Sequence, residues 1–329
     1  MTKRYLLIDA GGTQLKLGLM EDERLVNQVQ IPAHSEQGIR PALELISGVG
    51  HSWLAGAAPD GIGLALTGIV DHEECRLRSV NAKFVDAVDF DFPAWANTNF
   101  QCPIVMENDA RAAMIGEWKY GAGKGHDDLV MLTFGTGVGS SAIIGGQPLR
   151  GRHDQAGILM GHFTIDRASG RCNCGNIGCV ESVASGWVLP GKLQQEPGFA
   201  DSAMAQVPKL DFEALFHHAD KGDRVAITVR DRFLEAWSLA AVNAIHAYDP
   251  EVLVLGGGVM QAGDLIRARI QAHVDEYAWT PWGKVEVMTA TLGNQAAIWG
   301  MKHLIDARTG PTPSKPIIPK TIKSTNAVY

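Results

Sequence analysis

The sequence predicts an α/β protein in which two similar domains face each other across a cleft. Two glycine-rich turns that each carry a threonine, residues 11–13 and 135–139, join pairs of apolar β segments. The turns lie about 125 residues apart, a spacing that indicates an internal duplication. With 329 residues, the chain is long enough for two domains and a substantial core.

Composition places the chain among ordinary globular proteins, with 46% hydrophobic and 20% charged residues. A net charge of −7 argues against a general nucleic-acid binder, which is usually basic. No apolar run reaches the length of a membrane span. Because the chain enters its first strand without a secretory leader and has an odd number of cysteines, we expect a cytoplasmic protein with no nucleic-acid or membrane partner.

The first turn, residues 9–13, reads DAGGT. No GK[ST] sequence opens a helix after it, so we predict a hairpin rather than a P-loop. Gly11 and Gly12 would let backbone N–H groups approach phosphate oxygens. Thr13 adds a hydroxyl, and Asp9 offers a carboxylate to a metal ion or its waters. Taken alone, the same pattern also fits a bare turn.

The rest of the first half alternates between apolar strands and helices. We predict strands at residues 5–8, 15–20, 61–71 and 102–106, and helices at residues 41–56 and 93–100. A polar loop between them carries Asn81. A further helix begins within residues 107–111 and runs through residue 118.

The start of that further helix reads ENDA, directly after a buried strand. Asn108 and Asp109 have two interpretations there. Either residue type is preferred as a helix N-cap, where its side chain accepts an unpaired N–H. A carboxylate at the end of such a strand also suits a general base, because ligands collect at this edge of a sheet. Both interpretations can hold for neighbouring residues.

The second half begins with the second turn, which contains Thr136 and Gly137. We predict strands at residues 129–134, 141–144, 251–255 and 285–290, and helices at residues 183–189, 203–216, 223–248, 263–277 and 294–307. The last helix is expected to pack back on the first domain. Gly257 and Gly258 belong to a GGG run that suits either close approach of a nucleotide or a tight turn. Residues 310–329 are rich in proline and show no periodicity, which predicts a mobile tail.

Three of the five cysteines, Cys172, Cys174 and Cys179, fall within eight residues, and His162 precedes them. Thiolate sulfur and imidazole nitrogen are the ligands that tetrahedral Zn²⁺ takes in structural sites. Interleaved glycines would let the backbone fold around an ion. The alternatives are three buried thiols with an unrelated histidine, or a disulfide, which the odd cysteine count disfavours.

These motifs together resemble the ROK family of repressors and sugar kinases. The shared patterns are DxGGT, ENDA, GTGVG, GH-x₉-CxCGxxGCxE and GGG, and they span roughly residues 5 to 309. The resemblance implies the two-domain actin-like, or ribonuclease H-like, sugar-kinase fold with duplicated domains. It divides the chain into residues 1–119 plus 294–309, residues 120–293 and the tail.

The resemblance implies an ATP-dependent kinase that phosphorylates a hexose or an N-acetylhexosamine, expected at its 6-hydroxyl, with Asp109 as the catalytic base. The sugar-binding positions would be Gly68, Asn81, Asn108, Asp109, His162 and Glu181. The positions for ATP and Mg²⁺ would be Asp9, Gly11, Gly12, Thr13, Thr136, Gly137, Gly257 and Gly258. Structural Zn²⁺ would be held by His162, Cys172, Cys174 and Cys179. A homodimer is expected by analogy.

Two positions depart from the family pattern. Leu159 stands where the family usually has a sugar-contacting glutamate, and Gln14 stands where a lysine often follows DxGGT. A leucine cannot accept a hydroxyl hydrogen bond, so the acceptor could be an N-acetylated amino sugar or a glycoside, with Asp154 or Gln155 as substitutes for the glutamate. Only about eight residues precede Asp9, so we expect no DNA-binding domain. A non-catalytic sugar sensor remains the alternative from another class.

Overall fold

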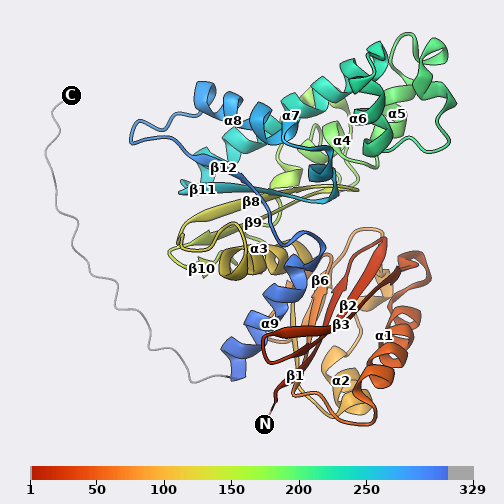
Figure 1. Ribbon diagram of the computed structural model, residues 1–329, viewed down its shortest axis with the longest axis vertical. Coiled ribbons are helices and arrows are strands. Elements are labelled where there is room, and N and C mark those ends of the chain that lie inside the picture. The colour runs from red at the N-terminus through yellow and green to blue at the C-terminus, as the bar shows by residue number, and fades with distance from the viewer. Residues whose placement is uncertain (1, 310–329) are drawn as a thin grey trace, which may run out of the picture.

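The computed structural model describes residues 2–309, and within them two five-stranded sheets share one design (Figure 1). Their strand orders are β3-β2-β1-β4-β7 and β10-β9-β8-β11-β12. The strands are β1 (Arg4–Ala10), β2 (Gln14–Glu21), β3 (Arg24–Pro32), β4 (Gly61–Leu66), β7 (Ile104–Asn108), β8 (Leu129–Phe134), β9 (Val138–Ile144), β10 (Gln147–Pro148), β11 (Val252–Gly256) and β12 (Glu286–Thr289), with a separate hairpin of β5 (Ile69–Asp71) and β6 (Arg76–Ser79).

Each sheet begins with an antiparallel hairpin and continues with parallel strands. β1 pairs antiparallel with β2 and parallel with β4, just as β8 pairs antiparallel with β9 and parallel with β11. The repeated order and direction confirm the duplication that the two glycine-rich turns predicted. Both turns therefore occupy the same place, at the tip of the first hairpin of a sheet.

The helices cover the sheets and join them. They are α1 (Ile39–Leu54), α2 (Phe92–Phe100), α3 (Asp109–Tyr120), α4 (Val180–Ala184), α5 (Leu189–Gln194), α6 (Phe212–Asp220), α7 (Arg224–Tyr248), α8 (Leu265–Tyr277) and α9 (Ala296–Thr309). Within the described residues, none combines the length and the apolar character needed to cross a membrane.

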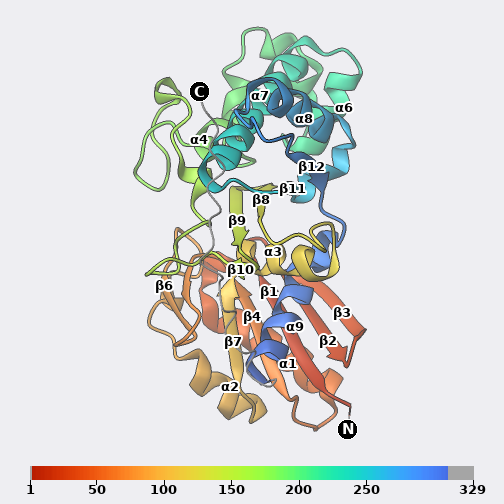
Figure 2. The same ribbon diagram turned by 90° about the vertical axis from the view of Figure 1, so that its left-hand side faces the viewer.

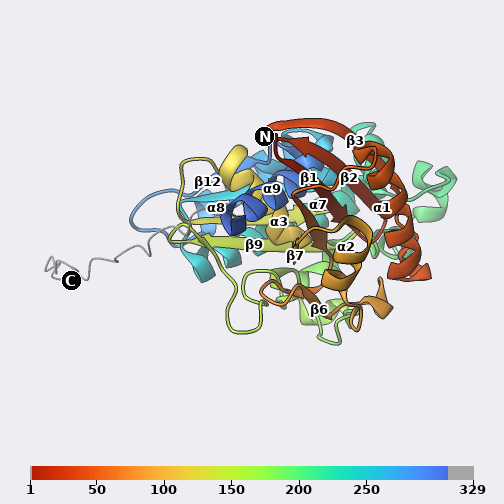
Figure 3. The same cartoon turned by 90° about the horizontal axis from the view of Figure 1, so that it is seen from below.

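The first sheet is covered on both faces. Side chains alternate along β1, so Leu6 and Ile8 join the core under α1 and α2, while Tyr5 and Leu7 join Met301 of α9. Figure 3 shows α1 and α2 on one side of this sheet and α9 on the other. The last helix thus returns to the first sheet, as the sequence predicted.

Helix α3 lies between the two sheets (Figures 1 and 2). Its Ala112 packs in the cluster with α9, whereas Met114 and Trp118 pack with β8 and β11. The crossing of α3 and α9 requires glycine on both helices. A Cβ on Gly116 would lie 2.0 Å from the Ala296 carbonyl oxygen, and one on Gly300 would lie 1.8 Å from that of Ala112.

One face of the second sheet packs on α7. Trp237 is fully buried there, stacks on Phe134 of β8 at 4.7 Å between ring centroids, and donates its indole N–H to the Ala184 carbonyl at 2.7 Å. Asp223 caps α7 by accepting the Ala226 N–H at 2.9 Å, which explains why the helix begins where the sequence indicated.

Several parts differ from the sequence prediction. The segment expected as one strand at residues 61–71 divides into β4 and β5, which belong to different sheets, and β6, β10 and α5 were not predicted. The helix expected at residues 183–189 is broken, because Gly186 and Trp187 donate their N–H groups to the second turn instead. The helix expected at 203–216 splits into a short 3₁₀ segment (Ala203–Gln206) and α6, which Asp211 caps. Strand β3 was not predicted, since its largely exposed residues show little apolar pattern. The tail prediction concerns residues 310–329, which lie outside the described residues, and the domain division stays a prediction.

Candidate active site

The first glycine-rich turn joins β1 to β2. Gly11 closes it by donating its N–H to the Gln14 carbonyl at 3.1 Å, while the Thr13 side chain is exposed. Asp9, at the end of β1, is 8% exposed and forms an ion pair with Lys16, whose Nζ lies 3.0 Å from its Oδ2. The turn therefore presents backbone N–H groups and a hydroxyl beside a carboxylate that faces a cation.

The sequence left open which of Asn108 and Asp109 is the helix N-cap and which is the candidate general base, and the structure separates the two. Asn108 is the N-cap of α3, because its Oδ1 accepts the Arg111 N–H at 3.0 Å. Its amide also donates to the Gly68 carbonyl and to Asp109 Oδ1, each at 3.0 Å. Gly68 follows β4 with φ +115°, a backbone conformation that favours glycine, and so presents its carbonyl to Asn108.

Asp109 is the first residue of α3 and is half-buried. Its Oδ1 accepts the Ala110 N–H at 2.8 Å as well as the Asn108 amide. No residue in the described part of the chain donates a hydrogen bond to its Oδ2. The carboxylate is thus fixed through one oxygen, and the other oxygen can accept a proton.

The surroundings of Asp109 raise the pKa of its carboxyl group. Burial is the main cause, and the negative charge of Asp9 raises the pKa further. The Ala110 N–H and the positive charge of Lys83 act in the opposite direction. A carboxylate with a raised pKa beside a second carboxylate is typical of acid–base sites.

The second turn lies beside this carboxylate. A Cβ on Gly139, at the start of β9, would lie 3.4 Å from the Ala110 Cβ, which brings the turn next to the first residues of α3. Thr136 is exposed at the tip of the turn, and Glu181 of α4 accepts the Val138 N–H at 2.9 Å. A side chain on Gly137 would strike Glu181, since its Cβ would lie 2.6 Å from Oε2.

A buried ion pair that the sequence analysis missed supports the ENDA segment. Glu107 and Arg111 are fully buried, with Oε1 and Nη1 2.9 Å apart, and Arg150 reaches Glu107 Oε2 at 2.6 Å. Arg111 also donates to the carbonyl oxygens of residues 149, 154 and 156. The i,i+4 spacing of Glu107 and Arg111 was a visible signal, but the loop that they hold lies about 40 residues away.

Asp154, which the sequence offered as a substitute for the missing glutamate, forms ion pairs within the same network. Its Oδ1 lies 2.9 Å from His72 Nδ1 and 3.5 Å from Arg150 Nη1. Leu159, at the predicted glutamate position, is half-buried at the start of a 3₁₀ turn (Met160–His162).

We expect Arg111→Met to lower the free energy of unfolding by about 3–5 kcal/mol, because it removes one of the two guanidinium groups paired with the buried Glu107 carboxylate and the donor to three carbonyl oxygens. Chemical denaturation measures this. The matched control is Arg78→Met, which breaks an exposed pair with Asp71 and should cost less than about 1 kcal/mol. Equal losses in the two variants would contradict a structural role for the buried pair.

The three glycines of the GGG run at the end of β11 have different surroundings. A Cβ on Gly257, at φ +93°, would lie 2.1 Å from the Phe134 carbonyl oxygen, and one on Gly256 would lie 2.4 Å from Met131. Packing on the β8 backbone thus requires glycine at Gly257, whereas at Gly256 the flexible end of Met131 can move aside. Only Gly258 of the three has open space around a Cβ, so any approach of a nucleotide to this run is expected there.

The His162, Cys172, Cys174 and Cys179 side chains converge, with all four ligand atoms within 4.8 Å of one another. The Cys174 and Cys179 sulfurs are 3.7 Å apart, and Cys172 Sγ lies 3.7 Å from His162 Nδ1. Four ligands at about 2.3 Å from one tetrahedral ion would be separated by about 3.8 Å, so these residues fit a zinc ion. Burial and the adjacent thiols raise the pKa of Cys179 to about 12, and a bound cation would favour the thiolate instead.

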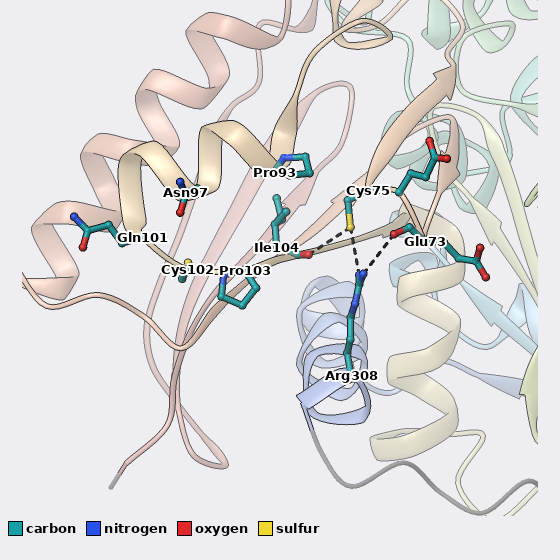
Figure 4. A pocket seen from close by; sticks show the side chains of 10 residues that line it. Glu73, Cys75, Pro93, Asn97, Gln101, Cys102, Pro103, Ile104 and Arg308 are labelled. Atoms are coloured by element: carbon teal, nitrogen blue, oxygen red, sulfur yellow. Dashed lines mark hydrogen bonds between the residues drawn. The ribbon is translucent and has the colours of Figure 1, made fainter.

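The remaining cysteines, Cys75 and Cys102, line an open pocket of about 460 Å³ (Figure 4). Arg308 of α9 points into it and lies 3.4 Å from Cys75 Sγ. The pocket lies at Ile104, where β7 begins, whereas Asp109 follows the end of β7, roughly 16 Å farther along five extended residues. This pocket contains none of the predicted site residues.

Comparisons with known proteins agree with this geometry. The ROK family model matches residues 5–308. A glucokinase of Thermotoga maritima is 32% identical over 92% of this chain and 97% of its own length, and one of Halalkalibacterium halodurans is 30% identical over 92% and 94%. The crystal structure of a ROK family glucokinase from Streptomyces griseus in complex with glucose and AMPPNP superposes with a TM-score of 0.79, at 26% identity over 93% of this chain and all of its own. The chain therefore belongs to the ROK family.

Proposed function

We propose that this protein, an ATP-dependent carbohydrate kinase, transfers the γ-phosphoryl group to the 6-hydroxyl of a hexose or an N-acetylhexosamine. The observation that carries this proposal is Asp109. Its Oδ2 accepts no hydrogen bond in the described residues, the charge of Asp9 at the first turn raises its pKa, and its neighbour Ala110 lies beside Gly139 of the second turn. The family membership and the glucokinases among the relatives support the same reaction class.

Asp109 acts as the general base. Its Oδ2 accepts the proton of the attacking hydroxyl as that oxygen approaches phosphorus, and such help typically supplies about 10²–10⁴-fold in rate. The backbone N–H groups of Gly12 and Thr136 in the two turns hold the phosphate oxygens, while the Gly11 N–H keeps the first turn closed. Asp9 would hold Mg²⁺, which would neutralise charge on the phosphates.

Sugar recognition falls to residues around Asp109 and Glu181. Asn108 is already oriented by its bonds to Gly68 and Asp109, and Glu181 is oriented by the Val138 N–H. Asn81 is exposed in the loop after β6, where it can reach a ligand. A site with such fixed polar groups rejects acceptors that leave them without partners.

The four-residue cluster is proposed to hold structural Zn²⁺. Four protein ligands leave no position for a water or substrate, so the ion would stabilise the segment rather than take part in chemistry. Cys179 is the residue before α4, and Glu181 lies in the first turn of that helix. The cluster thus fixes both His162 and the start of the helix that carries Glu181.

The test of the proposed acceptor hydroxyl compares glucose, mannose, N-acetylglucosamine, N-acetylmannosamine and several glycosides with 6-deoxyglucose in the presence of MgATP. We expect one sugar to give a phosphate ester whose phosphorus couples to the C6 protons in NMR. 6-Deoxyglucose should bind without being phosphorylated. A phosphorus coupled to another carbon's proton would contradict the assignment to the 6-hydroxyl. A homodimer, a cytoplasmic location and the absence of nucleic-acid partners stay predictions.

A further inference from the structure

Lys83 lies directly over the first glycine-rich turn. A Cβ built on Gly12 would lie 2.1 Å from Lys83 Cδ, 2.3 Å from Cε and 2.6 Å from Nζ. Gly12 does not have a positive φ, so the turn does not need glycine there for its backbone conformation. The glycine instead leaves room for the end of the lysine side chain, which lies in the space that a Cβ would fill.

Hydrogen bonds to Ser35 hold both the loop that carries Lys83 and the turn beneath it. Phe84, the next residue, is fully buried in the core of the first sheet, and its N–H donates to the Ser35 carbonyl at 3.0 Å. The Ser35 hydroxyl donates in turn to the Gly12 carbonyl at 2.6 Å. One short chain of hydrogen bonds therefore joins this loop to the turn, so the backbone at Lys83 is held beside Gly12.

The charge of Lys83 is not neutralised by a partner. In the described part of the chain, residues 2–309, it has no carboxylate within 4.0 Å and no hydrogen bond. Lys16, the other lysine at this turn, differs because it forms an ion pair with Asp9. Lys83 is half-buried, and its charge acts on Asp109, whose pKa it lowers. An ammonium with no ion-pair or hydrogen-bond partner among the described residues thus lies over the proposed phosphate turn, near enough to the proposed base to affect its pKa.

We propose that Lys83 is a further catalytic residue, whose ammonium contacts the phosphoryl group during its transfer over Gly12; this rests on the proposed kinase function. In the transfer, the bond from the γ-phosphorus to the bridging oxygen breaks and its electrons go to ADP. The sugar oxygen bonds to phosphorus and its proton goes to Asp109. Lys83 stays protonated throughout and balances the negative charge of the transferred group, the role that a positioned lysine or arginine has in other phosphoryl transfers.

The test compares Lys83→Met, Lys83→Gln and Lys83→Arg with wild type, using MgATP and the sugar that wild type phosphorylates. We expect Lys83→Met and Lys83→Gln to lower kcat by about 10²–10³, as loss of one preorganised donor typically does. The KM for the sugar and the affinity for ADP should stay within a few-fold of wild type. Lys83→Arg should recover part of kcat, because it restores the positive charge. Lys209→Met is the control for loss of an exposed lysine, whose side chain is 84% exposed.

A kcat within about threefold of wild type in both neutral variants would overturn the proposal, given the expected loss of about 10²–10³. A parallel loss of sugar and ADP affinity without recovery in Lys83→Arg would also overturn it, since that pattern indicates a structural role. Calorimetry with AMPPNP and ADP gives a readout that does not depend on turnover. If wild type phosphorylates no sugar, the proposed kinase function fails. The calorimetry still tests Lys83 in that case, because weaker binding of AMPPNP but not of ADP in Lys83→Met would place the lysine at the γ-phosphate.

Discussion

Asp109→Asn is expected to lower kcat by about 10²–10⁴ while the affinity for the sugar is retained. Asparagine keeps an oxygen that can accept the Ala110 N–H and the Asn108 amide, so the start of α3 should not move. It cannot accept the proton of the attacking hydroxyl. Initial rates of ADP release give kcat, and calorimetry gives the sugar affinity.

Asp109→Asn is also expected not to lower the stability of the protein at pH 7. The pKa of Asp109 is raised by folding, so its ionised form is less favourable in the folded state than in the unfolded chain. Above the unfolded pKa this charge costs stability, and the cost disappears as the pH falls below both pKa values. Asp109→Asn removes the charge, so its melting temperature at pH 7 should equal or exceed that of wild type.

The matched control for Asp109→Asn is Asp91→Asn at the N-cap of α2, where the side chain also accepts a backbone N–H, from Ala94 at 3.0 Å. Full turnover is expected in this control. An unchanged kcat in Asp109→Asn would contradict the assignment of Asp109 as the general base. A lower melting temperature together with lost sugar affinity would instead indicate that Asp109 is needed for folding.

Removal of the proposed zinc ion is expected to lower both the melting temperature and the affinity for the sugar. Residues 160–179 contain only short 3₁₀ turns and isolated bridges, such as that between Thr164 and Cys179, so they have little other structure to hold them. Structural zinc contributes about 10–16 kcal/mol of apparent binding free energy in zinc-finger peptides. Loss of the ion would release His162 and the start of α4.

Cys179→Ser tests the same claim without a chelator. We expect at least a tenfold weaker sugar affinity, because Glu181 would lose the fixed helix start that aims it at Val138, and tenfold corresponds to about 1.4 kcal/mol. Cys102→Ser is the control, since Cys102 is also buried but lies outside the cluster. A metal-free protein or a Cys179→Ser variant with wild-type melting temperature and sugar affinity would contradict a structural role for the cluster.

The sequence was sufficient to predict what depends on local pattern. The strand–turn–strand units were visible because apolar β segments flank each glycine-rich turn, and the cluster of cysteines was visible from its spacing. At the ENDA segment the sequence predicted a helix N-cap and a general base, but it did not show which of Asn108 and Asp109 has which role. The structure separates them, since the Asn108 side chain bonds the Arg111 N–H and Asp109 keeps one oxygen unbonded.

What the sequence missed depends on contacts between distant segments. Lys83 looks like an ordinary loop lysine until the fold brings it onto Gly12, about 70 residues earlier in the chain. The break after α4 could not be predicted either, because Gly186 and Trp187 have helix-compatible neighbours but bond to Gly135 and Thr136 of the second turn. Neither contact leaves a periodic signal.

The most direct test of the kinase assignment is the amount of ADP formed per molecule of sugar phosphate, measured with MgATP in the presence and absence of the accepted sugar. The assignment predicts a ratio of about one, with little ADP in the absence of sugar, because the hydroxyl rather than water attacks phosphorus. Sugar binding without any ADP formation would indicate a sensor. Equal ADP formation with and without sugar would indicate an ATPase, and either result would contradict a sugar kinase.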